Sequence, residues 1–292
     1  MTSVRLTAED SWVQQRIPVL DLSIAQVEDV RSQVPAGWVG AEGFSPEFQL
    51  VLPYRGHFVW EVGRDEVVGD SNQALFVTAG EAFRMRQQLA GGYAELIVTP
   101  VATLLEELAR GETRDLLLHP LFRRRSRRLD PHLQLLRARF LSCTAVDGGV
   151  EPLAAEELVV RLLRAALEGN GRARLPARSS QRLVDRTKTF LSAELGRSLT
   201  LSEISRTVGA SPGYLTQLFR DLEGVPLHRY LTQLRLSRAL SELPHADDLT
   251  ELALELGFSS HSHFSARFRQ AFGLTPSEFR RGCRLRAPPL LV

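Results

Sequence analysis

Cysteine is scarce in this chain, which has only Cys143 and Cys283 among 292 residues. The two lie far apart and form no CxxC pair, so neither a disulfide framework nor a zinc knuckle is indicated, and we interpret both as ordinary thiols. No stretch approaches the ~18 to 20 consecutive apolar residues that a membrane-spanning helix needs. The start, MTSVRLTAED, has no basic segment followed by an apolar one. We therefore expect a cytoplasmic protein with no membrane partner.

Motifs of known catalytic chemistry are also missing from the sequence. It contains no GxSxG nucleophile motif, no phosphate-binding loop and no HExxH zinc motif. We therefore predict that the protein is not an enzyme and has no catalytic residues, no metal and no cofactor. Its composition, with 43% hydrophobic and 24% charged residues, is typical of globular protein and leaves room for one large domain or two ordinary ones.

Charge is distributed unevenly along the chain. Residues 1 to 170 hold 18 Arg against 23 Asp and Glu, whereas residues 171 to 292 hold 18 Arg and Lys against 11 Asp and Glu. The net charges of these parts are −5 and +7. This charge difference is typical of a basic, phosphate-binding C-terminal domain attached to an acidic partner domain.

The hydrophobic period changes along the N-terminal half. From Phe44 to Pro100 short apolar runs alternate with turn residues, which predicts strands of an antiparallel sandwich or barrel. Residues 101 to 110, 130 to 143 and 151 to 168 instead repeat apolar positions at three and four, so helices are expected there. A leucine stripe on the last of these helices is either a dimer seam or domain core. Residues 169 to 181, GNGRARLPARSSQ, carry Gly, Pro, Arg and Ser without a period and predict a linker.

Capping signals then divide the C-terminal part into short helices. Thr200 with Glu203 forms a capping box that opens a helix ending near Gly209. Ser211 caps a second helix, which has Pro212 at its first position and stops at Gly224. A longer helix follows from about Pro226 to Leu243.

The same short unit occurs a second time. Asp247 or Asp248 opens a helix that Gly257 ends, and Ser259 or Ser260 begins a helix through Phe264, Phe268 and Phe272. A short helix joined by a Gly-containing turn to a capped amphipathic helix is the helix-turn-helix, whose second helix can enter the DNA major groove. The joining helix would span roughly 27 Å at 1.5 Å per residue, in the range of the ~34 Å between successive major grooves on one face of DNA. One copy would be weak evidence, but two copies in the basic part of the chain favour a DNA-binding domain.

Residues 252 to 281, LALELGFSSHSHFSARFRQAFGLTPSEFRR, resemble the signature of AraC/XylS-type transcription regulators. The matching positions are Ala253, Gly257, Phe258, Ser262, Phe264, Phe268, Arg269, Gly273, Thr275, Pro276, Phe279 and Arg280. The chain departs from the family at His263, where the family usually has Tyr. The resemblance extends back to about residue 182 and implies a DNA-binding domain over 182 to 284, with helix-turn-helix motifs at 200 to 223 and 248 to 272.

The histidines of the second motif could in principle bind a metal. Side chains at i and i+2 on a helix point ~200° apart, so His261 and His263 cannot comfortably share one ion. Positions off the apolar stripe instead predict base contacts, made by Gly213, Thr216 and Gln217 in the first motif and by His261, Ser262, Ser265 and Ala266 in the second. Predicted phosphate contacts are Arg206, Arg220, His263, Arg267 and Arg269, although each arginine could equally lie on a solvated helix face.

The sheet-rich N-terminal region, residues 1 to 168, is similar to the cupin-like sensor barrel of many AraC/XylS-type proteins, which implies a small-molecule effector and helices that mediate dimerisation. Catalytic cupins hold a metal with an HxH pair, a Glu and a later His, whereas this chain has His57 alone in that region. The predicted effector contacts are Tyr54, His57, Trp60, Phe76 and Arg84. The strand register is not known to one residue from the sequence, and a slip of one would turn the opposite set of side chains inward.

Together these features predict an α+β protein, with an N-terminal cupin-like β-barrel and helices and a C-terminal all-α domain of two helix-turn-helix motifs joined by a long helix. The predicted function is a transcription regulator, such as an activator, that binds double-stranded DNA under the control of a small effector. RNA polymerase and a second copy of the chain are further candidate partners. One alternative is a constitutive regulator whose N-terminal domain only dimerises. The other is a cupin-like enzyme with a helical appendage.

Overall fold

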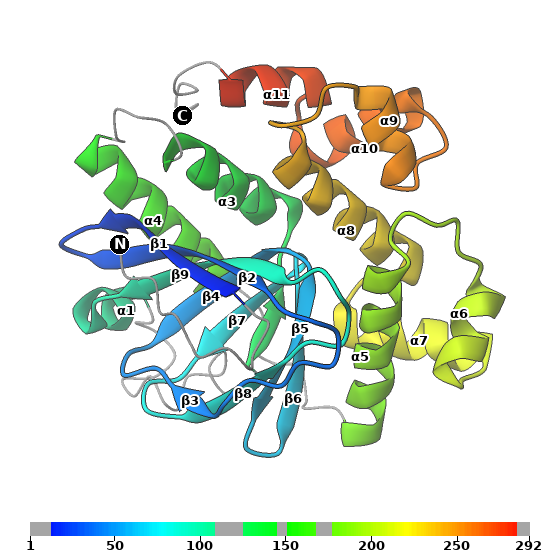
Figure 1. Ribbon diagram of the computed structural model, residues 1–292, viewed down its shortest axis with the longest axis horizontal. Coiled ribbons are helices and arrows are strands. Elements are labelled where there is room, and N and C mark those ends of the chain that lie inside the picture. The colour runs from blue at the N-terminus through cyan, green and yellow to red at the C-terminus, as the bar shows by residue number, and fades with distance from the viewer. Residues whose placement is uncertain (1–12, 109–124, 145–150, 168–176, 285–292) are drawn as a thin grey trace. The chain divides into compact units, whose positions relative to one another are not determined.

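The computed structural model describes residues 13–108, 125–144, 151–167 and 177–284. Their contacts divide the chain into two compact units (Figure 1). The sheet unit comprises residues up to 129 and residues 147–175. The helical unit comprises residues 130–146 and residues from 176 onward.

The sheet unit contains two antiparallel sheets. Its strands are β1 (Val13–Asp21), β2 (Ala25–Gln33), β3 (Gly43–Phe44), β4 (Gln49–Arg55), β5 (His57–Val62), β6 (Asp65–Asp70), β7 (Gln73–Val77), β8 (Ala82–Arg86), β9 (Tyr93–Pro100) and β10 (Ser126–Arg128). The first sheet has the order β1-β2-β9-β4-β7-β10 and the second β3-β8-β5-β6. The β-rich prediction is confirmed, but among the described residues the two sheets do not join into one closed barrel, and β1 and β2 precede the predicted strands.

Alternation along the strands builds the core between the two sheets. Val30, Val51 and Ile97 of the first sheet pack against Phe58 and Trp60 of the second, and all five side chains are buried. Because successive side chains point to opposite faces, one residue in two along each of these strands enters this core.

Helices α1 (Ala102–Leu108) and α4 (Pro152–Leu167) complete the described part of the sheet unit. On α4 the buried face includes Leu158, Leu162 and Leu163, whereas Leu153 is exposed. Most of the predicted leucine stripe is therefore domain core. A short arginine-rich segment precedes α4 in this unit, where Arg125 pairs with Glu81 and Arg127 donates to the carbonyl oxygens at 165 and 166.

The helical unit contains the predicted all-α domain. Its helices are α3 (Pro131–Thr144), α5 (Arg178–Ala193), α6 (Leu201–Val208), α7 (Pro212–Glu223), α8 (Leu227–Glu242), α9 (Leu249–Glu255), α10 (His261–Phe272) and α11 (Pro276–Arg284). Helix α5 begins at Arg178, inside the segment that the sequence predicted as a linker. Residues 168–176 of that segment lie outside the described residues.

Helix α3 belongs to the helical unit, although the sequence assigned residues 130 to 143 to the N-terminal domain. It packs against α8, α10 and α11. Arg137, only 1% exposed, donates from Nη2 to Ser237 Oγ of α8 at 2.8 Å. Apolar periodicity predicted this helix but not its partners, because a stripe of leucines can pack on any apolar surface.

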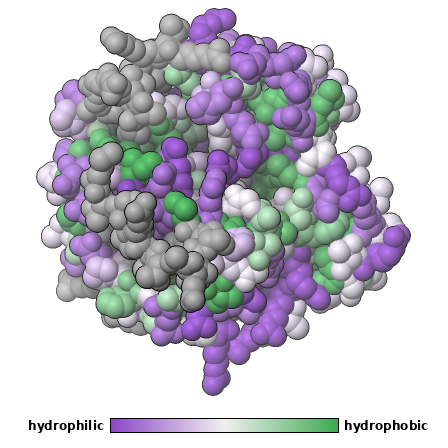
Figure 2. Space-filling view, viewed as in Figure 1, coloured by the Kyte–Doolittle hydropathy of each residue, from purple (hydrophilic) through white to green (hydrophobic). Residues whose placement is uncertain are grey.

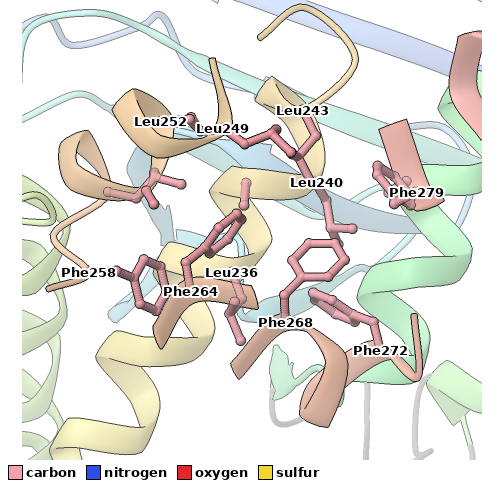
Figure 3. Close-up of a cluster of buried hydrophobic side chains, with 14 of the residues drawn as sticks. Leu236, Leu240, Leu243, Leu249, Leu252, Phe258, Phe264, Phe268, Phe272 and Phe279 are labelled. Atoms are coloured by element: carbon pink, nitrogen blue, oxygen red, sulfur yellow. The ribbon is translucent and has the colours of Figure 1, made fainter. Parts of the chain in front are cut away.

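Helix α8 is shared by the two cores of the helical unit. Its first half contributes Leu227, Leu231 and Leu234 to a core with α5, α6 and α7. Its second half contributes Leu236 and Leu240 to a core with α3, α9, α10 and α11, whose close packing is shown in Figure 3. The 16-residue helix is about 24 Å long at 1.5 Å per residue.

Hydrophilic residues are spread over the face shown in Figure 2, with hydrophobic residues between them in small patches. Within the described ranges no helix is both long enough and apolar enough to cross a membrane.

Candidate nucleic-acid interface

Helices α6 and α7 form the first helix-turn-helix. The Thr200 side chain accepts a hydrogen bond from the Glu203 amide and starts α6, and Gly209 ends it in the left-handed conformation, with φ of 72°. Ser211 then caps α7 through the Tyr214 amide. Leu215 and Phe219 are fully buried and hold α7 in the core. The turn chemistry is local, which is why the sequence predicted it.

The opposite face of α7 is exposed and carries the predicted base-reading residues. Gly213, Thr216 and Gln217 all lie on it. The Thr216 hydroxyl donates to the carbonyl oxygens of Pro212 and Gly213 at 3.0 Å, so its methyl group and oxygen lone pairs are what it can offer to a base. Gln217 Nε2 donates to Asp221 Oδ1 at 2.8 Å. The amide has a second N–H and a carbonyl oxygen, so Gln217 can still offer a donor and an acceptor to adenine.

Helices α9 and α10 form the second helix-turn-helix. Asp248 accepts hydrogen bonds from the amides of Thr250 and Glu251, and Ser260 accepts one from the His263 amide. The structure thus selects Asp248 and Ser260 from the two pairs of caps that the sequence left open. Phe264 and Phe268 are fully buried and Phe272 nearly so, and together they fix α10 in its core (Figure 3).

The predicted residues of α10 divide between an exposed face and its edge. Ser262, His263 and Ala266 are exposed, whereas His261 and Ser265 are half-buried beside the phenylalanine stripe. His261 Nε2 and Ser265 Oγ lie 3.4 Å apart. Ser262 and Ala266 are therefore more accessible to a base edge than the two half-buried residues.

His263 points away from His261 and has different partners. Its Nδ1 lies 3.0 Å from Ser259 Oγ, and its ring packs edge-on against Phe258 with centroids 5.6 Å apart. Arg267 Nε approaches His263 Nε2 at 3.5 Å. Within the described residues no group of three or more His, Cys, Asp or Glu side chains could hold a metal ion.

Exposed arginines surround both recognition helices. Arg206 and Arg220 lie on the first motif, and Arg267 and Arg269 on the second. None of the four forms an ion pair with a carboxylate of the described residues. Unpaired exposed guanidinium groups can bind phosphates without first breaking a salt bridge.

Two further exposed side chains were missed by sequence reasoning. Tyr214, which is not among the predicted contacts, is 54% exposed beside Gly213 and Gln217. Gln270, exposed on α10, accepts a hydrogen bond from Arg267 Nη1 at 3.1 Å. The N-cap at Ser211 was the available signal for Tyr214, because a residue in the first turn of a helix is often beyond the reach of the core.

The predicted effector contacts do not share one pocket. Trp60 lies in the core between the sheets, and Phe76 lies on the other face of its sheet. Tyr54 donates to Asp29 Oδ1 at 2.7 Å, and Arg84 is exposed. His57 is buried, its Nε2 has no hydrogen-bond partner among the described residues, and burial lowers its pKa to about 4. The five residues were chosen without a known strand register, and alternation places them on different faces.

The sheet unit has two further features, a small apolar pocket and a buried carboxyl group. An apolar pocket between the first sheet and helices α1 and α4 is lined by residues that include Leu50, Phe76, Pro100, Leu105, Leu163 and Ala166. On the opposite face of that sheet, Glu95 is 4% exposed and its Oε2 lacks a hydrogen-bond partner within the described ranges. Burial raises the pKa of Glu95 to about 8, although Arg16 nearby acts in the other direction.

Comparison with known proteins matches the helical unit to a family model described as a helix-turn-helix domain, over residues 204–282. The HTH-type transcriptional regulator ArgR of Pseudomonas aeruginosa is 36% identical over 148 residues, which are 48% of this chain and 44% of that protein. The HTH-type transcriptional activator RhaR of Salmonella schwarzengrund is 33% identical over 139 residues, 46% of this chain and 49% of that protein. The chain thus spans about half the length of these curated relatives.

A solved structure of an AraC-type regulator from Chromobacterium violaceum is 30% identical, with a TM-score of 0.35, and the match covers 37% of this chain and 98% of that one. The matched residues of the family model include both recognition helices and the signature of the second motif. Residues 204–282 therefore form a helix-turn-helix domain of the AraC type, similar to those of these transcriptional regulators.

Proposed function

We propose that the protein is a sequence-specific transcriptional regulator that reads two segments of DNA major groove with α7 and α10. The observation that carries this proposal is the pair of capped recognition helices on one shared helix, α8, each with an exposed face opposite a buried aromatic stripe. An exposed helix face bordered by unpaired arginines offers base-reading side chains together with phosphate ligands.

Base readout is expected to be unequal between the two helices. On α7 Gln217 can pair bidentately with adenine, and Thr216 can pack its methyl group on thymine. On α10 Ser262 is small and Ala266 has no polar group, so DNA shape is expected to contribute more to recognition there.

We propose further that the sheet unit binds a small effector and that α3 transmits its binding to the DNA-binding helices. Helix α3 packs within the helical unit against α8 and α10. On both sides of the segment that contains α3, before residue 130 and after residue 146, the chain belongs to the sheet unit. An effector that changes the conformation of the sheet unit would therefore act on α3 through both of its chain connections. Because α3 packs against α10, this would shift the population of the protein that is competent to bind DNA. The proposal includes a homodimer and a contact with RNA polymerase.

Selection of genomic DNA fragments by the purified protein at one salt concentration, followed by footprinting, tests the DNA-binding part. We expect one common motif with two protected major-groove segments about one helical turn, ~34 Å, apart. Gln217→Ala should relax specificity in one segment and Ser262→Ala in the other. Binding that is equal for all sequences and vanishes uniformly as salt rises would refute sequence-specific recognition in the effector-free protein.

Arginine substitutions separate phosphate contacts from base contacts. Arg220→Ala should weaken binding to all sequences alike and reduce the salt dependence by about one counterion. Arg64→Ala is the matched control, because Arg64 is exposed in the turn between β5 and β6 and its loss changes the charge equally. Small-molecule screening against the motif-bound complex then tests effector control, and a constitutive regulator would show no saturable ligand effect on DNA affinity.

A further inference from the structure

Arg235 lies on α8 between the two cores of the helical unit. Its guanidinium group donates to three backbone carbonyl oxygens: Nε to Leu195 at 2.9 Å, Nη2 to Arg197 at 2.6 Å and Nη1 to Gly257 at 2.8 Å. The first two acceptors lie between α5 and α6, which belong to the first core, and Gly257 lies in the turn between α9 and α10. One side chain therefore joins the segment that leads into the first helix-turn-helix to the turn of the second.

The backbones themselves approach closely at this place. A Cβ atom on Gly196 would lie 2.5 Å from the carbonyl oxygen of Glu255, and one on Gly257 would lie 2.8 Å from that of Gly196. Gly257 also has φ of +78°, which side-chain-bearing residues rarely adopt. The joint, defined as Gly196, Gly257 and Arg235, thus has no room for a side chain at either glycine.

The joint extends to the start of the second recognition helix. Arg235 lies over the Phe258 ring, with Cζ 5.9 Å from the centroid. Phe258 is buried and packs against Phe264 of α10, with centroids 5.2 Å apart. Leu195 packs against both cores. A change at Arg235 would thus reach α10 through buried contacts, without altering any residue on its exposed face.

We propose that Arg235 is a positioning residue that holds the two helix-turn-helix motifs at one separation and orientation, and so sets the spacing between the two DNA segments that the protein recognises. This inference rests on the proposed function. Helix α8 runs through both cores, but each core packs on a different half of it. The carbonyl bridge and the glycine contact add a second connection, which resists rotation of one motif about α8 relative to the other.

The test uses the full chain and the DNA fragment selected by the wild-type protein, with one or two base pairs inserted or removed between its protected segments. Wild-type affinity should fall about tenfold or more for each altered spacing. The Arg235→Ala variant should bind the original fragment about tenfold more weakly than the wild type. Its affinities for the fragments of different spacing should differ from one another by less than about threefold. Binding to either segment alone should be unchanged.

Two further variants separate positioning from general loss of structure. Gly196→Ala places a methyl group against the Glu255 carbonyl and should also flatten the spacing profile. Gly282→Ala on α11 is its matched control, because a Cβ atom there has nothing within 4 Å. If Arg235→Ala does not fold, Arg235→Lys replaces it, since a single ammonium group cannot reproduce the three-way bridge. Folded variants that keep the wild-type spacing profile would overturn the proposal.

A second measurement does not depend on DNA. Spin labels at residues 207 and 251, which lie exposed on α6 and α9, report the distance between the motifs in a chain whose two cysteines are replaced by serine. We expect a narrow distance distribution that Arg235→Ala broadens. An unchanged distribution would refute the positioning role even if no DNA motif were found, whereas a broadened distribution without any selected motif would refute the proposed function alone.

Discussion

Replacing Glu95 by glutamine should remove most of the alkaline destabilisation of the sheet unit. Glu95 lies on β9 between Tyr93 and Ile97, which belong to the core between the sheets, so its side chain points into that core. Its neighbours across the sheet are Val30 and Pro53, and neither side chain can donate a hydrogen bond. The carboxyl group is therefore held neutral in the folded protein, and Glu95→Gln would keep the shape of the side chain without an ionisable proton.

The size of the effect follows from the pKa shift. Burial raises the pKa of Glu95 from 4.5 to about 8. Below pH 4.5 the group is protonated in both the folded and the unfolded chain, and its contribution to stability is fully present. As the pH rises toward 8 the unfolded chain ionises first, and this contribution is lost. At about 1.4 kcal/mol per unit, the whole shift corresponds to roughly 5 kcal/mol, of which about 2 kcal/mol falls between pH 6.5 and 8.

Urea unfolding at pH 6.5 and pH 8.5 measures this difference. The window excludes His57, whose lowered pKa of about 4 makes it lose stability only as the pH falls below 6.5. The free energy of unfolding should drop by about 2 kcal/mol more in the wild-type protein than in Glu95→Gln. Glu42→Gln, at an exposed position, is the control and should behave like the wild type. Equal drops in wild type and Glu95→Gln would show that Glu95 is ionised in the folded state and would refute the reasoning.

Four further substitutions test other parts of the structure. Leu135→Ala on α3 should destabilise the helical unit by about 2 to 5 kcal/mol, seen as faster hydrogen exchange in α8 and α10. Leu163→Ala on α4 should instead speed hydrogen exchange in the sheet unit. Faster exchange of the sheet unit in Leu135→Ala would contradict the assignment of α3 to the helical unit. Tyr214→Ala should weaken DNA binding by about 1 kcal/mol in fluorescence anisotropy at fixed salt, and unchanged affinity would remove this exposed ring from the interface. Gly69→Ala should cost about 1 to 3 kcal/mol in thermal denaturation, because its Cβ would lie 2.6 Å from Phe58 Cζ, and an unshifted melting temperature would mean that the ring can move aside.

The helix ends of the DNA-binding motifs were predicted to within a residue or two, since their determinants are local. Ser211 and Ser260 each cap a helix through an amide three residues away, and Gly209 and Gly273 end helices with φ near +75°. Such signals need only a few consecutive residues, which the sequence displays directly.

The sheet unit was predicted less well because strand pairing is not local. The alternation over residues 44 to 100 was recognised, but β1 and β2 lie outside it. Most of the β1 side chains are exposed, so no apolar period identifies this strand. The inward or outward direction of Tyr54, His57 and Trp60 depends on a register that changes face with every residue.

By itself, the sequence determined the order of helices, their caps and turns, the two recognition stripes and the family signature, because each depends on residues within a turn or two of one another. Only the tertiary structure decided that α3 packs with the DNA-binding helices, that Tyr214 is exposed, that Glu95 is buried between Val30 and Pro53, and that Arg235 bridges the two motifs. Each of these joins residues distant in the chain, and one leucine stripe or one arginine has many possible partners until the whole chain has packed.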